Sequence, residues 1–160
     1  RLTAEGALES LGNRRIAVPV LDAAALPELT EARLALEPRL AARAARDCDG
    51  AAVAALARVD ADLDAAIRRG DVGGYLAGNH RFHAELNALA AAPILEGLVQ
   101  QLWLRFGPSL RVVSGRVGTA NLPDRHKDLL DALRARDADA AARAMHEDVA
   151  QGMALIAASL

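Results

Sequence analysis

Four side chains of this sequence could together hold a divalent metal ion: Asn79, His83, His126 and Asp148. Asn79 and His83 stand four residues apart within an apolar stripe of helical spacing, so both face the same side of one helix. His126 precedes three leucines at helical spacing, and Asp148 follows a methionine by three residues, so each lies on an inward face. Buried polar groups need partners, because leaving one unpaired costs about 1–3 kcal/mol.

Two imidazoles, one amide and one carboxylate form a set of nitrogen and oxygen donors. Such donors suit Zn, Ni, Mn or Fe, and of these we expect Zn first, with Ni or Mn as alternatives. With neutral histidines the set carries one negative charge, so a bound divalent ion would keep a net positive charge. That ion could bind a small carboxylate in its open positions.

A simpler interpretation is that these polar residues only hydrogen-bond one another within the core. The other candidate groups favour structural roles. His80 and His146 point away from the stripes and are expected at the surface. The run Asp60-Ala61-Asp62-Leu63-Asp64 lacks the glycine turn and terminal glutamate of a calcium loop, so a solvated helix face is expected. Cys48 has no base close in sequence and is expected to be inert.

The elements that must position these groups are helices. The chain has 160 residues, 52% hydrophobic but only 2% aromatic, which favours one close-packed domain built from alanine, leucine and valine. A net charge of -2 argues against a nucleic-acid surface spread over this domain. One cysteine fits a reducing compartment, and no apolar run reaches the ~18 residues that cross a bilayer. We therefore expect a cytoplasmic protein without membrane contact, and a sequence that is a fragment.

Residues 1–25 differ from the rest of the chain. Arg1–Leu11 could end a helix, Gly12–Arg15 form a turn and Ile16–Val20 a short apolar strand, with a linker after it. From residue 26 onward helical periodicity dominates, with breaks at Asp, Gly and Pro clusters. The expected helices are Pro27–Arg46, Ala51–Arg69, Val72–Ala91, Pro93–Gly115 with a kink at Gly107-Pro108, Pro123–Arg136 and Ala138–Ala158, with a loop at Gly118–Leu122. This predicts an all-α fold, an antiparallel bundle of six or seven helices.

The order of several short motifs resembles the ligand-binding FCD domain of FadR-like transcription regulators in the GntR family. These motifs are Glu31-Ala32-Arg33-Leu34-Ala35-Leu36-Glu37-Pro38, then Asn79-His80-Arg81-Phe82-His83 with Leu86, then Ala92-Pro93-Ile94-Leu95, His126 with Leu130, and Asp137–Ala141 leading to Met145. Each motif is unspecific alone, but their order and spacing match over about residues 26–160. The resemblance implies an effector-binding and dimerisation domain over 26–160, acting as a homodimer.

The resemblance also implies where a metal would bind. The family's ligands are an Asp or Asn, two histidines, and a third histidine three residues after the methionine of the last helix. Asn79, His83 and His126 match the first three, while Asp148 stands where the usual histidine is missing. The usual set also carries one negative charge, so the carboxylate has moved from one ligand position to another.

A small carboxylate effector bound beside the metal is a further implication. Arg33 is the first candidate for holding its carboxylate, since a guanidinium can do so with two hydrogen bonds. Arg105 and Arg111 are secondary candidates, and for each of them a surface salt bridge is an equal alternative.

Residues 1–25 resemble the end of the family's winged helix-turn-helix domain, with its last helix and wing. Arg14 and Arg15 would then lie near DNA phosphates, although a solvated basic turn explains them equally well. DNA binding itself would need the missing N-terminal domain.

The sequence thus predicts the sensor domain of a bacterial GntR/FadR-type regulator, not an enzyme. A metal-free FCD sensor of another small molecule is the nearest alternative. A helical-bundle metalloenzyme would need a general base beside the metal, for which only Glu85 and Glu147 are available. A purely structural dimerisation bundle is the third alternative.

Overall fold

The computed structural model describes residues 3, 7–19, 21–117 and 125–159, and of residues 108–117 only the helical backbone. In this described part the chain forms a short β-hairpin followed by six helices. The strands are β1 (Glu9–Ser10) and β2 (Ile16–Ala17), and the helices are α1 (Leu26–Asp47), α2 (Gly50–Arg68), α3 (Val72–Ala88), α4 (Pro93–Val117), α5 (Arg125–Ala135) and α6 (Ala138–Ala157). The predicted all-α bundle is confirmed.

Aspartate side chains begin three of the helices. Asp49, Asp71 and Asp137 each accept a hydrogen bond from the backbone N–H three residues on, at 2.7–2.8 Å, at the starts of α2, α3 and α6. Such caps satisfy one of the orphan N–H groups of a first turn. Before α3, Gly70 takes the left-handed conformation with φ +66°, which glycine adopts without steric cost. These short polar breaks keep successive helices close together.

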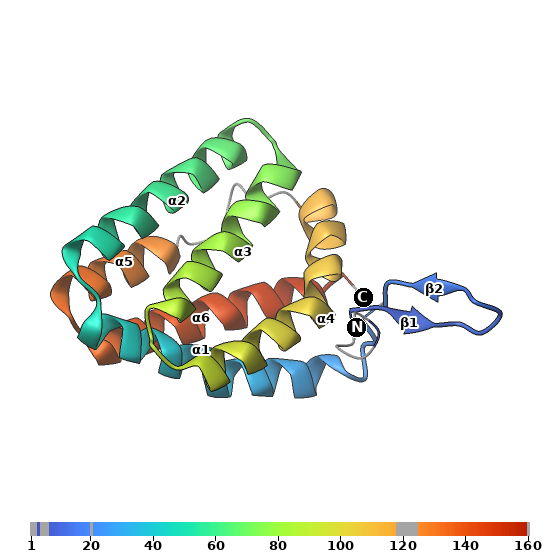
Figure 1. Ribbon diagram of the computed structural model, residues 1–160. Helices are drawn as coiled ribbons and strands as arrows, with labels where there is room; N and C mark the ends of the chain where they lie inside the picture. Colours follow the sequence, from blue (N-terminus) through green and yellow to red (C-terminus); the bar gives the residue numbers. More distant parts are fainter. Residues whose placement is uncertain (1–2, 4–6, 20, 118–124, 160) are drawn as a thin grey trace.

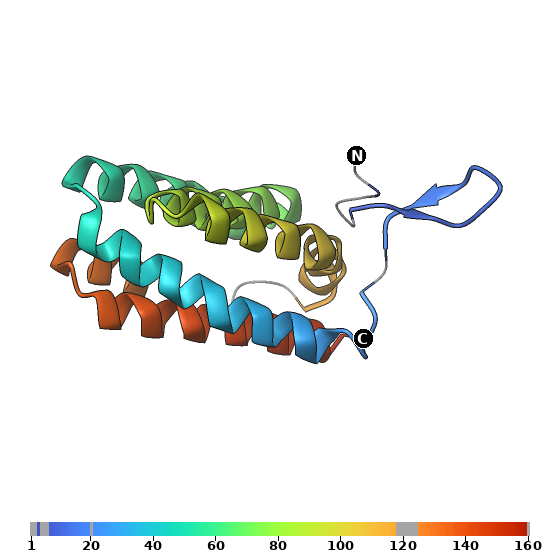
Figure 2. The same ribbon diagram turned by 60° about the horizontal axis from the view of Figure 1, so that its bottom comes forward.

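The helices lie in two layers. Figure 2 shows α2, α3 and α4 in one layer and α1, α5 and α6 in the other. Within the layers α1 packs along α6, α2 along α3 and α5 along α6. The large side chains that are fully buried between the layers include Leu40, Leu56, Phe82, Leu86, Phe106, Leu129, Leu133, Met145 and Ile156. Figure 1 also shows α4 running in two different directions, which agrees with the kink expected at Gly107-Pro108.

The N-terminal segment differs in part from expectation. Glu9–Ser10 is a strand paired with Ile16–Ala17, so a helix reaching Leu11 is wrong, and the second strand stops short of Val18. The turn between the strands places Gly12, Asn13 and Arg14 at positive φ, and such a turn suits a hairpin. Figure 1 shows this hairpin extending away from the helices. The expected loop at residues 118–122 and the start at Pro123 lie outside the described residues.

Candidate metal centre

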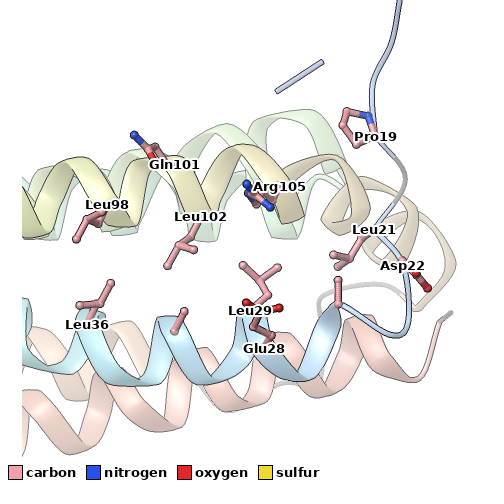
Figure 3. Close-up of a pocket in the computed structure, with 12 residues that line it drawn as sticks. Pro19, Leu21, Asp22, Glu28, Leu29, Leu36, Leu98, Gln101, Leu102 and Arg105 are labelled. Carbon is pink, nitrogen blue, oxygen red and sulfur yellow. The ribbon is translucent and has the colours of Figure 1, made fainter. Parts of the chain in front are cut away.

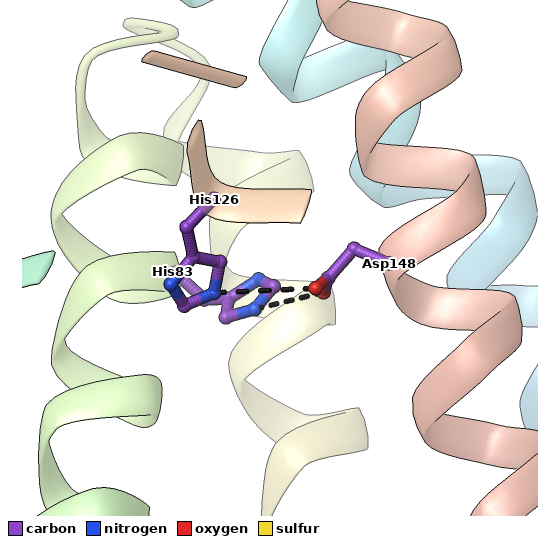
Figure 4. A group of neighbouring side chains, drawn as sticks. All are labelled: His83, His126 and Asp148. Atoms are coloured by element: carbon purple, nitrogen blue, oxygen red, sulfur yellow. Dashed lines mark ion pairs between the residues drawn. The ribbon is translucent and has the colours of Figure 1, made fainter. Parts of the chain in front are cut away.

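His83, His126 and Asp148 come together between the two layers of helices. One ligand atom from each lies within 4.8 Å of the others, although they belong to α3, α5 and α6 (Figure 4). Nε2 of His83 is 3.1 Å from Oδ2 of Asp148, and Nε2 of His126 is 4.0 Å from Oδ1 of the same carboxylate. Both imidazoles are buried, whereas the Asp148 side chain keeps 18% of its surface exposed. The cluster therefore offers two nitrogens and one carboxylate at a single partly accessible point.

Aromatic packing fixes the planes of the two imidazoles. The ring of His126 stacks on Phe82, with centroids 3.9 Å apart and planes 10° apart. His83 lies edge-on to His126 at 5.4 Å and packs against Trp103 at 5.2 Å. Because Phe82 and His83 are neighbours on α3, one turn of that helix supplies one candidate ligand and the ring on which the second candidate, His126, stacks.

Each imidazole has a second carboxylate on its other side. Nδ1 of His126 lies 3.1 Å from Oδ1 of Asp60, and Nδ1 of His83 lies 3.5 Å from Oε2 of Glu37 without making a hydrogen bond. Both carboxylates are buried. Histidines that bind metals in proteins commonly donate their other N–H to such a group, which leaves Nε2 free as the ligand. The residues present therefore fit a divalent metal.

Electrostatics within the cluster favour a charged His83 when no metal is bound. Burial opposes protonation of this ring, but the carboxylates of Asp148 and Glu37 outweigh burial and raise the pKa of His83 to about 9. Burial likewise opposes ionisation of Asp148, yet the hydrogen bond and charge of His83 hold its pKa below the usual range. A proton and a metal ion would thus compete for Nε2 of His83.

Arg33 belongs to the same network but already has a partner. Its guanidinium pairs with both carboxylate oxygens of Glu37, at 2.5 and 3.1 Å. It also lies 4.0 Å from the ring centroid of Phe106 and 5.1 Å from that of Trp103. The charge of Arg33 is near enough to help lower the pKa of Asp148. Glu37 consequently links Arg33 on one side to His83 on the other.

The other residues predicted from the sequence are not among the three clustered side chains. Asn79 is half-buried, one turn before His83 on α3. Arg105 is exposed and lines a separate cavity of about 590 Å³ between α1 and α4 (Figure 3), whose lining includes none of the three clustered residues. The side chain of Arg111 lies outside the described residues. Arg14 and Arg15 are exposed in the hairpin turn.

Asp60 is the residue that the sequence interpretation placed wrongly. It is 2% exposed rather than part of a solvated face, because it faces His126 and Lys127 of α5. Asp60 follows Leu56 by four residues and precedes Leu63 by three, so the apolar stripe of α2 could have revealed it. Glu37 was likewise missed as a partner, although it stands between Arg33 and Leu40 on the buried stripe of α1.

The surface positions expected for two further histidines are confirmed. His80 and His146 are exposed, and Cys48 is buried. Glu85 pairs with Arg81 at 2.7 Å, and Glu147 is exposed. No helix in the described part of the chain combines the length and the hydropathy that a membrane span needs.

The FCD domain model matches residues 28–151. The chain is 26% identical over 159 residues to the HTH-type transcriptional regulator McbR of Escherichia coli strain K12, covering 98% of this chain and 72% of that protein. The solved structure of E. coli McbR/YncC superposes with a TM-score of 0.89 at 26% identity, covering 98% of this chain and 79% of that one. A Streptococcus agalactiae GntR structure gives a TM-score of 0.67 at 20% identity, covering 96% and 77%, and so shares the fold.

Proposed function

The chain belongs to the FCD-domain family of GntR/FadR-like regulators, and we propose that it senses a small organic acid beside a divalent metal held by His83, His126 and Asp148. The observation that carries the proposal is the convergence of these three ligand atoms within 4.8 Å of one another. Binding of the acid would shift the bundle between arrangements that hold upstream DNA-binding domains differently.

The donor set supports zinc as the metal, with nickel or manganese as alternatives. Three protein ligands would leave a position open, and a metal in such a site supplies a positive charge that attracts carboxylate oxygens. Asn79, on the same face of α3 as His83, is the candidate for a weak fourth ligand. The family has an Asp or Asn at the position of Asn79. Here Asp148 provides the negative charge that an aspartate at that position would supply.

The charges around the cluster support an acidic effector. Glu37 is balanced by Arg33 and Asp60 by Lys127, while the ion pairs of Asp148 in the described chain are with histidines. With neutral imidazoles the cluster therefore has one negative charge in excess, and a divalent ion reverses the sign. A small anion is the ligand that such a site would attract.

Arg33 is the proposed partner of the effector carboxylate. Because Glu37 occupies its guanidinium, an incoming carboxylate would share Arg33 or displace Glu37 from it. Movement of Glu37 would also change the surroundings of His83, whose Nδ1 lies 3.5 Å from Oε2 of Glu37. Effector and metal would then be coupled through one carboxylate. Arg105 and Arg111 stay secondary candidates for this role.

The residues around the cluster favour a regulatory role over a catalytic one. Neither Glu85 nor Glu147 is buried beside it, so neither is placed as a general base. The E. coli protein McbR, to which this chain is similar, is a transcriptional regulator. We infer a homodimeric cytoplasmic regulator, with DNA bound through a winged-helix domain of which the β1–β2 hairpin is the wing and Arg14 and Arg15 the phosphate contacts.

The test is thermal unfolding of metal-free and zinc-loaded protein against a panel of small mono- and dicarboxylic acids. The proposal predicts that at least one acid raises the unfolding temperature only when zinc is present. Replacing Arg33 by lysine, which keeps a positive charge opposite Glu37 but lacks the two-pronged guanidinium, should reduce that rise while zinc alone still stabilises the variant. An acid that stabilises metal-free protein equally well would favour the metal-free sensor, and turnover of an acid would favour the enzyme.

A further inference from the structure

We propose that Asp60 is a positioning residue, which fixes His126 as the tautomer protonated on Nδ1 and so directs its Nε2 lone pair toward His83 and Asp148. The consequence for metal affinity rests on the proposed function. The effect on the imidazole itself does not.

The contacts of Asp60 determine which nitrogen carries the proton. Oδ1 of Asp60 lies 3.1 Å from Nδ1 of His126, and Oδ2 accepts a hydrogen bond from Lys127 at 2.5 Å. An ionised carboxylate can only accept hydrogen bonds, so Nδ1 must be the donor. Burial opposes ionisation of Asp60, but His126 and Lys127 outweigh it and hold the pKa of Asp60 below its usual range. In a neutral ring the proton on Nδ1 leaves Nε2 unprotonated.

Stacking alone cannot make this choice. Phe82 holds the plane of the His126 ring at 3.9 Å, but a ring turned over by half a rotation would stack equally well. In that orientation Nδ1 and Nε2 would exchange sides with the two ring carbons. The hydrogen bond to Asp60 distinguishes the two orientations, because only one places a ring N–H against the carboxylate.

Lys127 holds Asp60 in place. Its ammonium contacts Oδ2 of Asp60 and, at 2.9 Å, Oδ2 of Asp64, which is one turn further along α2. Asp60 therefore connects α2 to two consecutive residues of α5, His126 and Lys127. The lysine also provides a positive charge beside the buried carboxylate.

His83 lacks an equivalent arrangement. Its Nδ1 is 3.5 Å from Glu37 and makes no hydrogen bond, and both oxygens of Glu37 are already bonded to Arg33. The Nδ1 atoms of the two imidazoles thus have different contacts. His126 is held by a dedicated carboxylate, and His83 by its pairing with Asp148.

The experiment compares Asp60→Leu, which removes the acceptor, with Asp60→Asn, which keeps the shape and can present a donor. Asp64→Asn is the matched control, because Asp64 contacts Lys127 but not His126. The first readout is the ¹⁵N NMR signature of the His126 imidazole in metal-free protein at alkaline pH. The second is zinc affinity, measured by competition with a chromophoric chelator.

Wild type and Asp64→Asn should show His126 protonated on Nδ1 alone. Both Asp60 variants should show a mixture of tautomers or the Nε2–H form, and zinc should bind about 10- to 100-fold more weakly. If Asp60→Leu fails to fold, Asp60→Asn decides the outcome. A wild-type tautomer in the folded Asp60 variants would overturn the proposal. Wild type that binds no zinc but shows the expected tautomer pattern would refute the metal site and leave the role of Asp60 standing.

Discussion

Nε2 of His83 lies 3.1 Å from Oδ2 of Asp148, which joins α3 to α6 through a buried imidazole and a half-buried carboxylate. The pKa of His83 is raised to about 9, so this contact is an ion pair at neutral pH when no metal is bound. A divalent metal bound at this point must displace the proton. Because of this competition, zinc affinity and the stability of the metal-free protein should both depend on pH.

Stability of the metal-free protein should fall between neutral and alkaline pH. The pKa of His83 is about 9 in the folded protein against an ordinary value of 6.5, so its contribution is complete below pH 6.5 and lost as pH rises through about 9. The loss should be on the order of 3 kcal/mol, at about 1.4 kcal/mol per pKa unit. Urea unfolding in the presence of a chelator measures it. His83→Ala should remove this pH dependence, and a flat wild-type profile would contradict the assignment.

Zinc binding near neutral pH should release about one proton, because His83 must lose its proton to become a ligand. Calorimetric titrations in two buffers of different ionisation enthalpy measure the number of protons released. Zinc affinity should also increase with pH until about pH 9, the pKa of His83, and then level off. A binding enthalpy that does not depend on the buffer would contradict the displacement of a proton from His83 by zinc.

Replacing Glu37 by glutamine should destabilise the protein by about 3–5 kcal/mol, because it leaves the buried guanidinium of Arg33 without its counter-charge. The matched control is Glu85→Gln. Arg81 and Glu85 have the same spacing on α3 and a 2.7 Å contact, but their side chains are 62% and 37% exposed. That variant should change the free energy of unfolding by less than about 1 kcal/mol. Equal effects of the two variants in chemical denaturation would argue against the buried pair.

Asp148→Asn should weaken zinc binding more than tenfold, since the carboxylate is the only charged ligand of the proposed set. Asn79→Ala should have a smaller effect, because an amide is a weak ligand. The double variant Asn79→Asp with Asp148→His restores the family's usual pattern and should bind zinc at least as well as wild type. Glu147→Gln, at the neighbouring exposed carboxylate of α6, serves as the control. Equal zinc affinity of Asp148→Asn and wild type would exclude Asp148 as a ligand.

Most of the fold could be predicted because its determinants are local. Asp49, Asp71 and Asp137 mark helix starts by capping their own first turns, and apolar spacing identifies the buried faces. The N-terminal segment was harder, because residues 1–11 contain too few periodic positions to distinguish a helix from a strand. There the pairing of Glu9–Ser10 with Ile16–Ala17 decides the conformation.

The candidate site could be predicted only in part. Helical spacing alone places His83, His126 and Asp148 on inward faces, and the structure brings these three together. The spacing of Asp60 from Leu56 and Leu63 could have indicated that it is buried, but its contact with His126 of α5 depends on how α2 and α5 pack. Which carboxylate meets which Nδ1 depends on the register between α1 and α3 and between α2 and α5. No spacing within a single helix contains that information.

The decisive measurement is elemental analysis of the purified protein, with His126→Ala and His146→Ala beside it. His146 is an exposed histidine of α6 and controls for nonspecific binding by imidazoles. Wild type and His146→Ala should contain stoichiometric zinc, nickel or manganese, and His126→Ala should contain none. Metal-free wild type that no added divalent ion stabilises would contradict the proposed metal site, and the cluster would then be a protonated ion-pair network with His83 at its centre.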